Sequence, residues 1–192
     1  GVLKGLADDG LVTRIPGKGT FVATSKIETP VPAFRGVRAQ LEQQGITTTT
    51  QVVRLEQITP TASIRNHLSL SAGEPVILVE RLRSVDGTPI SIHRSWVPAA
   101  LAPTLTESDV VGEQLCHILA GQYALFPRRI TQTLESTSAT RAEAKLLRLS
   151  AGSPLLLLQE TTFDEADRPF EFSRIAFCGD RIRLSFEFTS QD

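Results

Sequence analysis

The sequence has few of the residues that build metal sites, disulfides or aromatic surfaces. Its 192 residues include no methionine, one tryptophan, one tyrosine, three histidines and two cysteines. Cys116 and Cys178 are far apart in the sequence, and neither has a CxxC or Cys/His ligand spacing, so neither a disulfide framework nor a zinc site organises the fold. No segment has the pattern of a signal peptide or a membrane span. These absences predict a cytoplasmic protein with reduced thiols.

The net charge gives no reason to expect a polyanionic partner for the chain as a whole. The formal charge at pH 7 is −1, from 20 basic and 21 acidic side chains. The charges are unevenly distributed, because residues 1–38 carry +3 and the remainder carries −4. Any contact with a polyanion therefore belongs near the start of the sequence.

The first 24 residues have the pattern of a helix followed by a β-hairpin. Apolar residues at helical spacing over 2–9 stop at Gly10, a common helix terminator. Two β-prone runs then flank the turn sequence Pro-Gly-Lys-Gly, at 11–15 and 20–23. The glycines of that turn permit the positive φ that a tight hairpin needs.

An extended segment separates this unit from the rest of the chain. Pro30 and Pro32 disfavour helix and favour an extended backbone. We therefore predict three parts: a unit at 1–24, a linker at 25–32 and a domain at 33–192.

The domain alternates between helical and β-prone segments. Threonines and other β-branched residues dominate the first β-prone run, and such side chains suit a pleated surface. Apolar spacing predicts helices over 33–44 and 106–121 and strands over 47–58, 127–138 and 181–189.

An internal repeat organises the same domain. LSLSAGEP at 68–75 recurs as LRLSAGSP at 147–154, 79 positions later, and each copy continues into two β-prone runs separated by a turn. Thr140 and Glu143 have the spacing of a capping box at the start of the second helix. Two helix–hairpin units predict an α+β fold, in which an antiparallel sheet carries its helices on one side and the two units enclose a cleft.

Nucleotide-binding and catalytic patterns are absent. A Walker A loop needs GxxxxGK followed by Ser or Thr and a helix, whereas Lys18 is followed by Gly19 and a β-prone run. No histidine has metal-ligand spacing, and no serine or cysteine lies in a recognisable nucleophile pattern. We predict no enzyme, no cofactor and no metal. A surface hairpin with a solvated lysine is the alternative to any functional interpretation of Lys18.

The front unit follows the pattern L…GL…R…G.GTFV through Leu6, Gly10, Leu11, Val12, Arg14, Gly17, Gly19, Thr20, Phe21 and Val22. This pattern resembles the end of the winged helix-turn-helix in the GntR superfamily of bacterial transcription regulators. The resemblance implies a DNA-binding wing, in which side chains hydrogen-bond phosphates and glycines allow close approach, formed by Arg14, Gly17, Lys18, Gly19 and Thr20. A complete head has further N-terminal helices, so we expect a truncated form that does not bind its operator specifically.

Two longer stretches carry a second resemblance, ERLRSVDGTPISIHRSWVP at 80–98 and RPFEFSRIAFCGDRIRL at 168–184. They are similar to the UTRA ligand-binding domain of HutC-type members. The resemblance implies a chorismate-lyase-like fold, a homodimer, and a small cytosolic effector that controls operator binding, as in a repressor. A chorismate-lyase-like enzyme acting on a small carboxylate and a dimerisation module without a ligand are the alternatives.

Arg81 and Arg83 are the first candidates for effector contacts. Two residues apart on a strand, they project to one face and could clamp a phosphate or carboxylate. Glu80, Glu160 or Glu171 could instead pair with them on a solvated face. The resemblance favours the anion, because sugar-phosphate-responsive UTRA domains place an Arg-x-Arg pair at this point.

The resemblance assigns further effector contacts. Glu171 matches a family glutamate that accepts hydrogen bonds from ligand hydroxyls or an amine, and His93 stands where the family usually has another glutamate. On the residues alone, Glu171 could be a cross-strand partner of an arginine and His93 could cap a polar cluster. Gln114-Leu115-Cys116 and Phe177 replace a Ser-Leu-Tyr segment and a tyrosine of sugar-phosphate members. We predict an anionic effector, not a particular sugar, bound by Arg81, Arg83, His93, Glu171, Arg174 and Phe177.

Overall fold

An antiparallel six-stranded sheet is the centre of the molecule. The computed structural model of the chain describes residues 1–8, 12–22, 25–31 and 36–190. The sheet has the order β4-β5-β6-β9-β8-β7. Its strands are β4 (Thr48–Ile58), β5 (Val76–Val85), β6 (Thr88–Pro98), β7 (Arg129–Ser138), β8 (Pro154–Phe163) and β9 (Pro169–Cys178).

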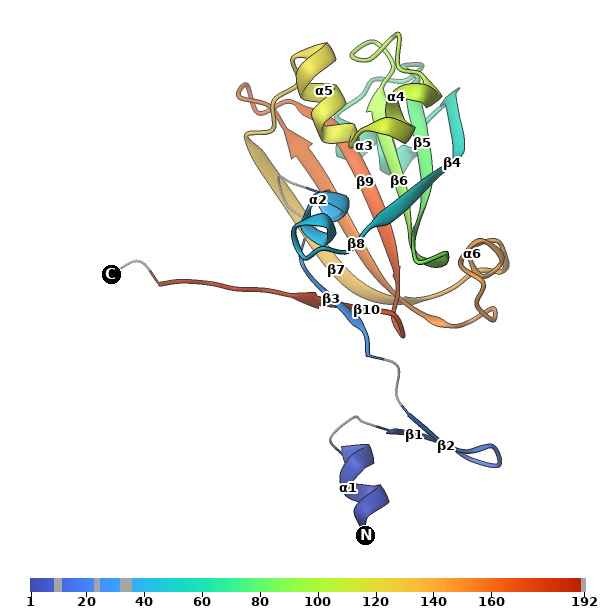
Figure 1. Ribbon diagram of the computed structural model, residues 1–192. Coiled ribbons are helices and arrows are strands. Elements are labelled where there is room, and N and C mark those ends of the chain that lie inside the picture. The colour runs from blue at the N-terminus through green and yellow to red at the C-terminus, as the bar shows by residue number, and fades with distance from the viewer. Residues whose placement is uncertain (9–11, 23–24, 32–35, 191–192) are drawn as a thin grey trace.

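Helices cover both faces of this sheet (Figure 1). The two helices of the sequence repeat, α3 (Ala62–Leu68) and α6 (Arg141–Leu147), pack on one face against apolar residues of β5, β6, β8 and β9. The opposite face packs against α2 (Gly36–Gln43), α4 (Glu107–Gly112) and α5 (Leu115–Tyr123). The predicted α+β fold with an antiparallel sheet is confirmed. The prediction that the helices pack on one side of the sheet is wrong, because β5 and β6 are buried on both faces and need cover on both.

The two copies of the repeat form the two halves of the sheet. β6 and β9 are central neighbours, and Arg94 lies opposite Arg174, its equivalent in the other copy. An antiparallel pair has a local two-fold axis, so the register relates the halves by an approximate two-fold axis through this pair. The edge strands extend the repeat, because β4 precedes α3 as β7 precedes α6.

Tertiary packing changes three of the predicted elements. The single helix predicted over 106–121 is two helices, since Glu113 and Gln114 adopt extended backbone between α4 and α5. The strand predicted over 181–189 is only the short β10 (Ile182–Ser185). The segment 25–32, predicted as a linker, contains β3 (Ile27–Pro30). This strand pairs in parallel with β10 and therefore packs on the domain.

The N-terminal unit consists of α1 (Val2–Asp8) and a hairpin of β1 (Val12–Ile15) and β2 (Gly19–Val22). Figure 1 shows this unit beyond the end of β3 that points away from the six-stranded sheet. Over residues 1–8 and 12–22, none of the described side chains is buried. The hairpin turn places Gly17 and Gly19 at positive φ, which the sequence pattern predicted.

Several absences concern the described part of the chain alone. No helix there is long and apolar enough to cross a membrane. No cluster of histidine, cysteine, aspartate and glutamate is grouped there as a metal ion would require. Cys116 and Cys178 are both free thiols.

Candidate functional site

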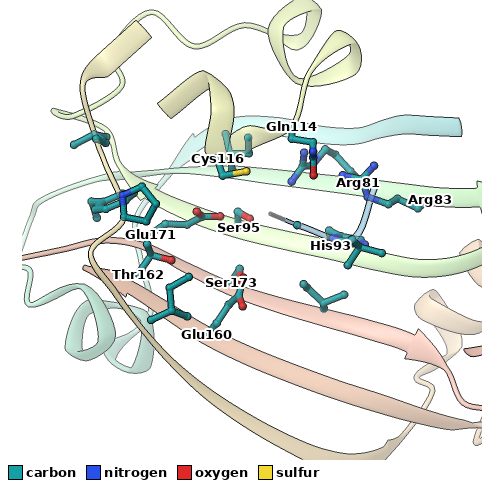
Figure 2. A pocket seen from close by; sticks show the side chains of 18 residues that line it. Arg81, Arg83, His93, Ser95, Gln114, Cys116, Glu160, Thr162, Glu171 and Ser173 are labelled. Atoms are coloured by element: carbon teal, nitrogen blue, oxygen red, sulfur yellow. The ribbon is translucent and has the colours of Figure 1, made fainter. Parts of the chain in front are cut away.

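A polar cavity lies on the sheet face that carries α2, α4 and α5 (Figure 2). Its floor is made by side chains of β5, β6, β9 and β8, around the approximate two-fold axis. Its cover comes from the start of α2, the start of α5 and the segment before β7. The polar lining residues are Arg81, Arg83, His93, Ser95, Gln114, Cys116, Glu160, Thr162, Glu171 and Ser173.

Two buried guanidinium groups form one end of the cavity. Arg81 is 4% exposed and Arg83 is 3% exposed, and alternation along β5 turns both toward the cavity. Arg83 Nη1 donates to Thr50 Oγ1 at 2.9 Å. Nε and Nη1 of Arg81 and Nε of Arg83 find no acceptor among the described residues. Burial lowers the pKa of Arg81, and burial together with Arg81 lowers the pKa of Arg83 to about 9.

The glutamates that could have neutralised these arginines do not pair with them. Glu80 is on the opposite face of the sheet, where its carboxylate pairs with Arg94. Neither Glu160 nor Glu171 forms an ion pair with Arg81 or Arg83 within the part of the chain that the structure describes. Neither buried cation is therefore in an ion pair with a described residue, although the charge of Glu171 acts on Arg81 from a distance. This arrangement costs free energy unless an anion pairs with the two arginines.

His93 lies beside the arginines and is neutral. Its Nε2 is 2.8 Å from Ser91 Oγ, and its ring meets Phe177 edge-on at 6.3 Å between centroids. Burial, followed by the positive charges of Arg83 and Arg81, holds the pKa of His93 well below its usual range. A neutral ring with one nitrogen bonded to Ser91 can donate or accept one hydrogen bond at the other.

Two carboxyl groups form the other end of the cavity. Ser173 Oγ donates to Glu160 Oε1 at 3.3 Å, and Gln132 Nε2 donates to Glu160 Oε2 at 2.9 Å. Burial, with a contribution from the nearby charge of Glu171, raises the pKa of Glu160 to about 7. Burial also raises the pKa of Glu171, and a hydrogen bond from Ser95 and the charge of Arg81 oppose that effect.

The start of α5 covers the arginine end of the cavity. Gln114, the N-cap of this nine-residue helix, and Cys116, in its first turn, line the cavity, and the backbone dipole there favours an anion. Gly36, at the start of α2, is so close that a Cβ on it would lie 2.4 Å from Gln114 Oε1. Burial raises the pKa of Cys116 to about 11, so its thiol is a neutral wall of the cavity.

The structure brings together four of the six predicted effector residues. Arg81, Arg83, His93 and Glu171 line one cavity. Arg174 does not: it lies three residues from Glu171, an odd spacing that turns it to the other face, where it is exposed. Phe177 is fully buried behind His93 and packs in the core. A ligand-binding role for each stays a prediction.

Sequence reasoning missed several lining residues of the second hairpin, among them Glu160, Thr162 and Ser173. The repeat carries the signal that could have found them. Counting 79 positions from Arg81 and Arg83 gives Glu160 and Thr162. Ser95 was missed because a serine on a strand carries no motif.

The predicted wing residues are exposed where the structure describes them. Gly17, Lys18, Gly19 and Thr20 are exposed at the hairpin tip. The side chain of Arg14 lies outside the described part of the structure.

Comparison with known proteins places most of the chain in one family. The UTRA domain family matches residues 43–183. The chain is 29% identical over 180 residues to the HTH-type transcriptional repressor NagR of Bacillus subtilis (strain 168), covering 93% of this chain and 73% of that protein. It is 28% identical over 182 residues to the probable fructoselysine utilization operon transcriptional repressor of Escherichia coli (strain K12), with 95% and 74% covered.

A solved structure shows the same fold. PhnF from Mycobacterium smegmatis superimposes with a TM-score of 0.80 at 25% identity, over 98% of this chain and 83% of that chain. None of these three proteins is named as an enzyme, and they give no support to the chorismate-lyase-like alternative.

Proposed function

The chain belongs to the UTRA domain family and is a transcription regulator of the GntR type. From this premise we propose that a small anionic metabolite in the central cavity controls the affinity of the protein for operator DNA. The anion is bound between Arg81 and Arg83 and below the start of α5. Effector binding weakens DNA binding, and the protein represses its target genes until the effector is present.

One observation carries this proposal: Arg81 and Arg83 are buried, close together and without an anionic partner among the described residues. Guanidinium groups hold phosphate and carboxylate through paired hydrogen bonds, and desolvation strengthens those bonds. The neutral ring of His93 and the dipole of α5 add two further contacts that favour the same ligand.

A route from the cavity to the DNA-binding unit supports the control step. Gly36 and Val37 line the cavity from the start of α2. α2 follows β3 in the sequence, and β3 follows the hairpin of β1 and β2. A ligand that shifts Gln114, which lies against Gly36, therefore moves α2, which follows the hairpin and β3 in the sequence. Differential affinity of the effector for two positions of α2 supplies the coupling, typically about 1–3 kcal/mol.

The DNA-binding part of the proposal concerns the hairpin tip. Lys18 and Thr20 bind phosphate oxygens, together with Arg14, and the glycines at 17 and 19 allow close approach to the backbone. In a cytoplasmic homodimer, two such units would read half-sites that lie about one helical turn apart or a multiple of it.

Operator binding by the full-length protein tests the proposal. Sugar phosphates, phosphonates, amino-acid catabolites and carboxylates are screened for release of operator DNA and for thermal stabilisation. A metabolite at about 100 times its dissociation constant adds about 2.7 kcal/mol to the free energy of unfolding, and melting rises by about 5–10 °C.

Arg81→Ala is expected to abolish the response of DNA binding to that metabolite. Arg54→Ala is the matched control, because Arg54 is an exposed arginine on the neighbouring strand β4. The proposal fails if no metabolite changes operator affinity, or if Arg81→Ala, folded by circular dichroism, responds like the parent protein.

A further inference from the structure

The two halves of the cavity carry opposite charges at equivalent positions. The two-fold relation between the repeat copies places Arg81 of β5 and Glu160 of β8 at matching points, 79 residues apart. Both side chains line the same cavity. The duplication therefore produces a site that is symmetric in backbone but dipolar in charge.

The cationic half has unused hydrogen-bond donors. Arg81 is 4% exposed, and its Nε and Nη1 find no acceptor in the described residues. A buried guanidinium that lines a cavity with two nitrogen donors lacking an acceptor is suited to bind a ligand anion.

No described cation forms an ion pair in the acidic half. Glu160 is bonded by Ser173 and Gln132, and Glu171 by Ser95, all of them neutral groups. The two carboxylates repel each other, and the ion pairs formed by described residues include neither. Neutral hydroxyl donors leave that repulsion in place, whereas a positive charge between the carboxylates removes it.

From this juxtaposition we infer that the effector is zwitterionic, with its acidic group between Arg81 and Arg83 and a protonated amine at its other end between Glu160 and Glu171. The inference rests on the proposed function and specifies the chemistry of its effector. Arg81 and Glu171 influence each other electrostatically without pairing, so a ligand that spans the cavity supplies each with its missing partner.

Matched ligands test this chemistry in the full chain. Three series are titrated calorimetrically at about pH 7: aminoalkyl, hydroxyalkyl and plain alkyl phosphates of equal length, starting from O-phosphoethanolamine, 2-hydroxyethyl phosphate and ethyl phosphate. At the best chain length, the amine is expected to bind about tenfold or more tighter than the other two, the effect of one added charge pair.

Variants assign the preference to the acidic half. Glu160→Gln is expected to reduce the advantage of the amine to about twofold, and Arg81→Gln to weaken all three ligands alike. Glu135→Gln, at an exposed glutamate of β7, is the matched control and is expected to leave the preference intact.

Proton release gives a second readout. Glu160 faces Glu171 on β9, with Arg81 on β5, His93 on β6 and Cys116 on α5 lining the same cavity. Because the pKa of Glu160 is about 7, its carboxyl is partly protonated near neutral pH. Binding of an ammonium group lowers that pKa and expels about half a proton more than the amine-free ligand does. Buffers of different ionisation enthalpy measure the difference, which disappears in Glu160→Gln.

The outcomes separate this inference from the proposed function. Equal binding of the three ligands at every length, binding of none, or an amine preference that survives in both Glu160→Gln and Glu171→Gln overturns the zwitterionic effector. If the alkyl phosphates bind equally and depend on Arg81, the anion site of the proposed function stands while the inference fails.

Discussion

Strand alternation determines which side chains point into the cavity. Arg81 and Arg83 reach the cavity because even spacing on β5 keeps them on one face. The same rule removes Arg174, whose odd spacing from Glu171 turns it to the other face. Burial of Glu160 is what raises the pKa of its carboxyl group.

The pKa of Glu160 predicts a dependence of stability on pH. Its folded pKa is about 7, against an ordinary value of 4.5, so the folded state binds more protons between these values. The contribution is fully present below about pH 4.5 and is lost as pH rises through about 7, by as much as about 3 kcal/mol. Glu160→Gln is expected to lose less stability than the parent protein over that window.

Urea unfolding from about pH 5.5 to about pH 8.5 measures this difference. The difference between the two curves reports the titration of Glu160 together with its effect on the neighbouring Glu171. Parallel curves would show that Glu160 titrates normally.

The contact of Gly36 with Gln114 gives a second prediction at this scale. Gly36→Ala places a Cβ 2.4 Å from Gln114 Oε1 at a φ of +72°, so the backbone is strained and Gln114 must turn away. Gly45→Ala has a φ of +78° with open space around it and is the control for backbone strain alone. We expect Gly45→Ala to lower the free energy of unfolding, measured in urea, by about 1 kcal/mol, and Gly36→Ala to lower it by more.

Effector binding distinguishes the two glycine variants further. Gly36→Ala alone is expected to weaken the binding of an anionic ligand, because Gln114 lines the arginine end of the cavity. Equal binding by the two variants would contradict a role for Gln114 there.

At the scale of elements, the break between α4 and α5 shapes the site. One helix over 106–121 is what apolar spacing predicts, although Gly112, a poor helix former, stands where α4 ends. Extended backbone at Glu113 and Gln114 lets each helix pack its own apolar side on the sheet, with Val110 and Leu115 both buried. The interruption also creates the helix start that covers the cavity.

The caps of the two repeat helices are not equivalent. Thr140 forms a full capping box with Glu143, which also pairs with Arg94 of β6 at 2.8 Å. Thr61 caps α3 through one long hydrogen bond to Ile64 N at 3.4 Å. Thr140→Ala is therefore expected to lower the free energy of unfolding by about 1–2 kcal/mol, and Thr61→Ala by about 0.5 kcal/mol. Denaturant titration of both variants checks the order, and a larger loss in Thr61→Ala would refute it.

At the scale of the molecule, stability is concentrated in the domain that β3 completes. Thr29 is fully buried, and its Oγ1 donates to Gln40 Oε1 at 3.3 Å. The backbone of Val31 donates to Ser185 O at 2.9 Å. The described side chains of the N-terminal unit, by contrast, are not buried.

Two deletions test this division. A chain that starts at residue 25 is expected to melt within about 2 °C of the 192-residue chain, because none of the described side chains that it loses is buried. A chain that starts at residue 33 lacks β3 and is expected to melt about 5 °C lower or more. Differential scanning calorimetry measures both, and equal melting of the two shortened chains would show that β3 is not part of the stable domain.

The sequence by itself determined the hairpin at PGKG, the repeat, the antiparallel α+β class and the Arg-x-Arg pair, because these follow from local periodicity, turn chemistry and similarity between segments. Tertiary structure decided the rest. Helices on both faces, the split between α4 and α5, the pairing of β3 with β10 and the acidic end at Glu160 depend on which segments distant in sequence share a face. The PGKG turn lies at the tip of an exposed hairpin. The cavity has opposite charges at its two ends because the pairing of β6 with β9 places the two copies of the repeat side by side.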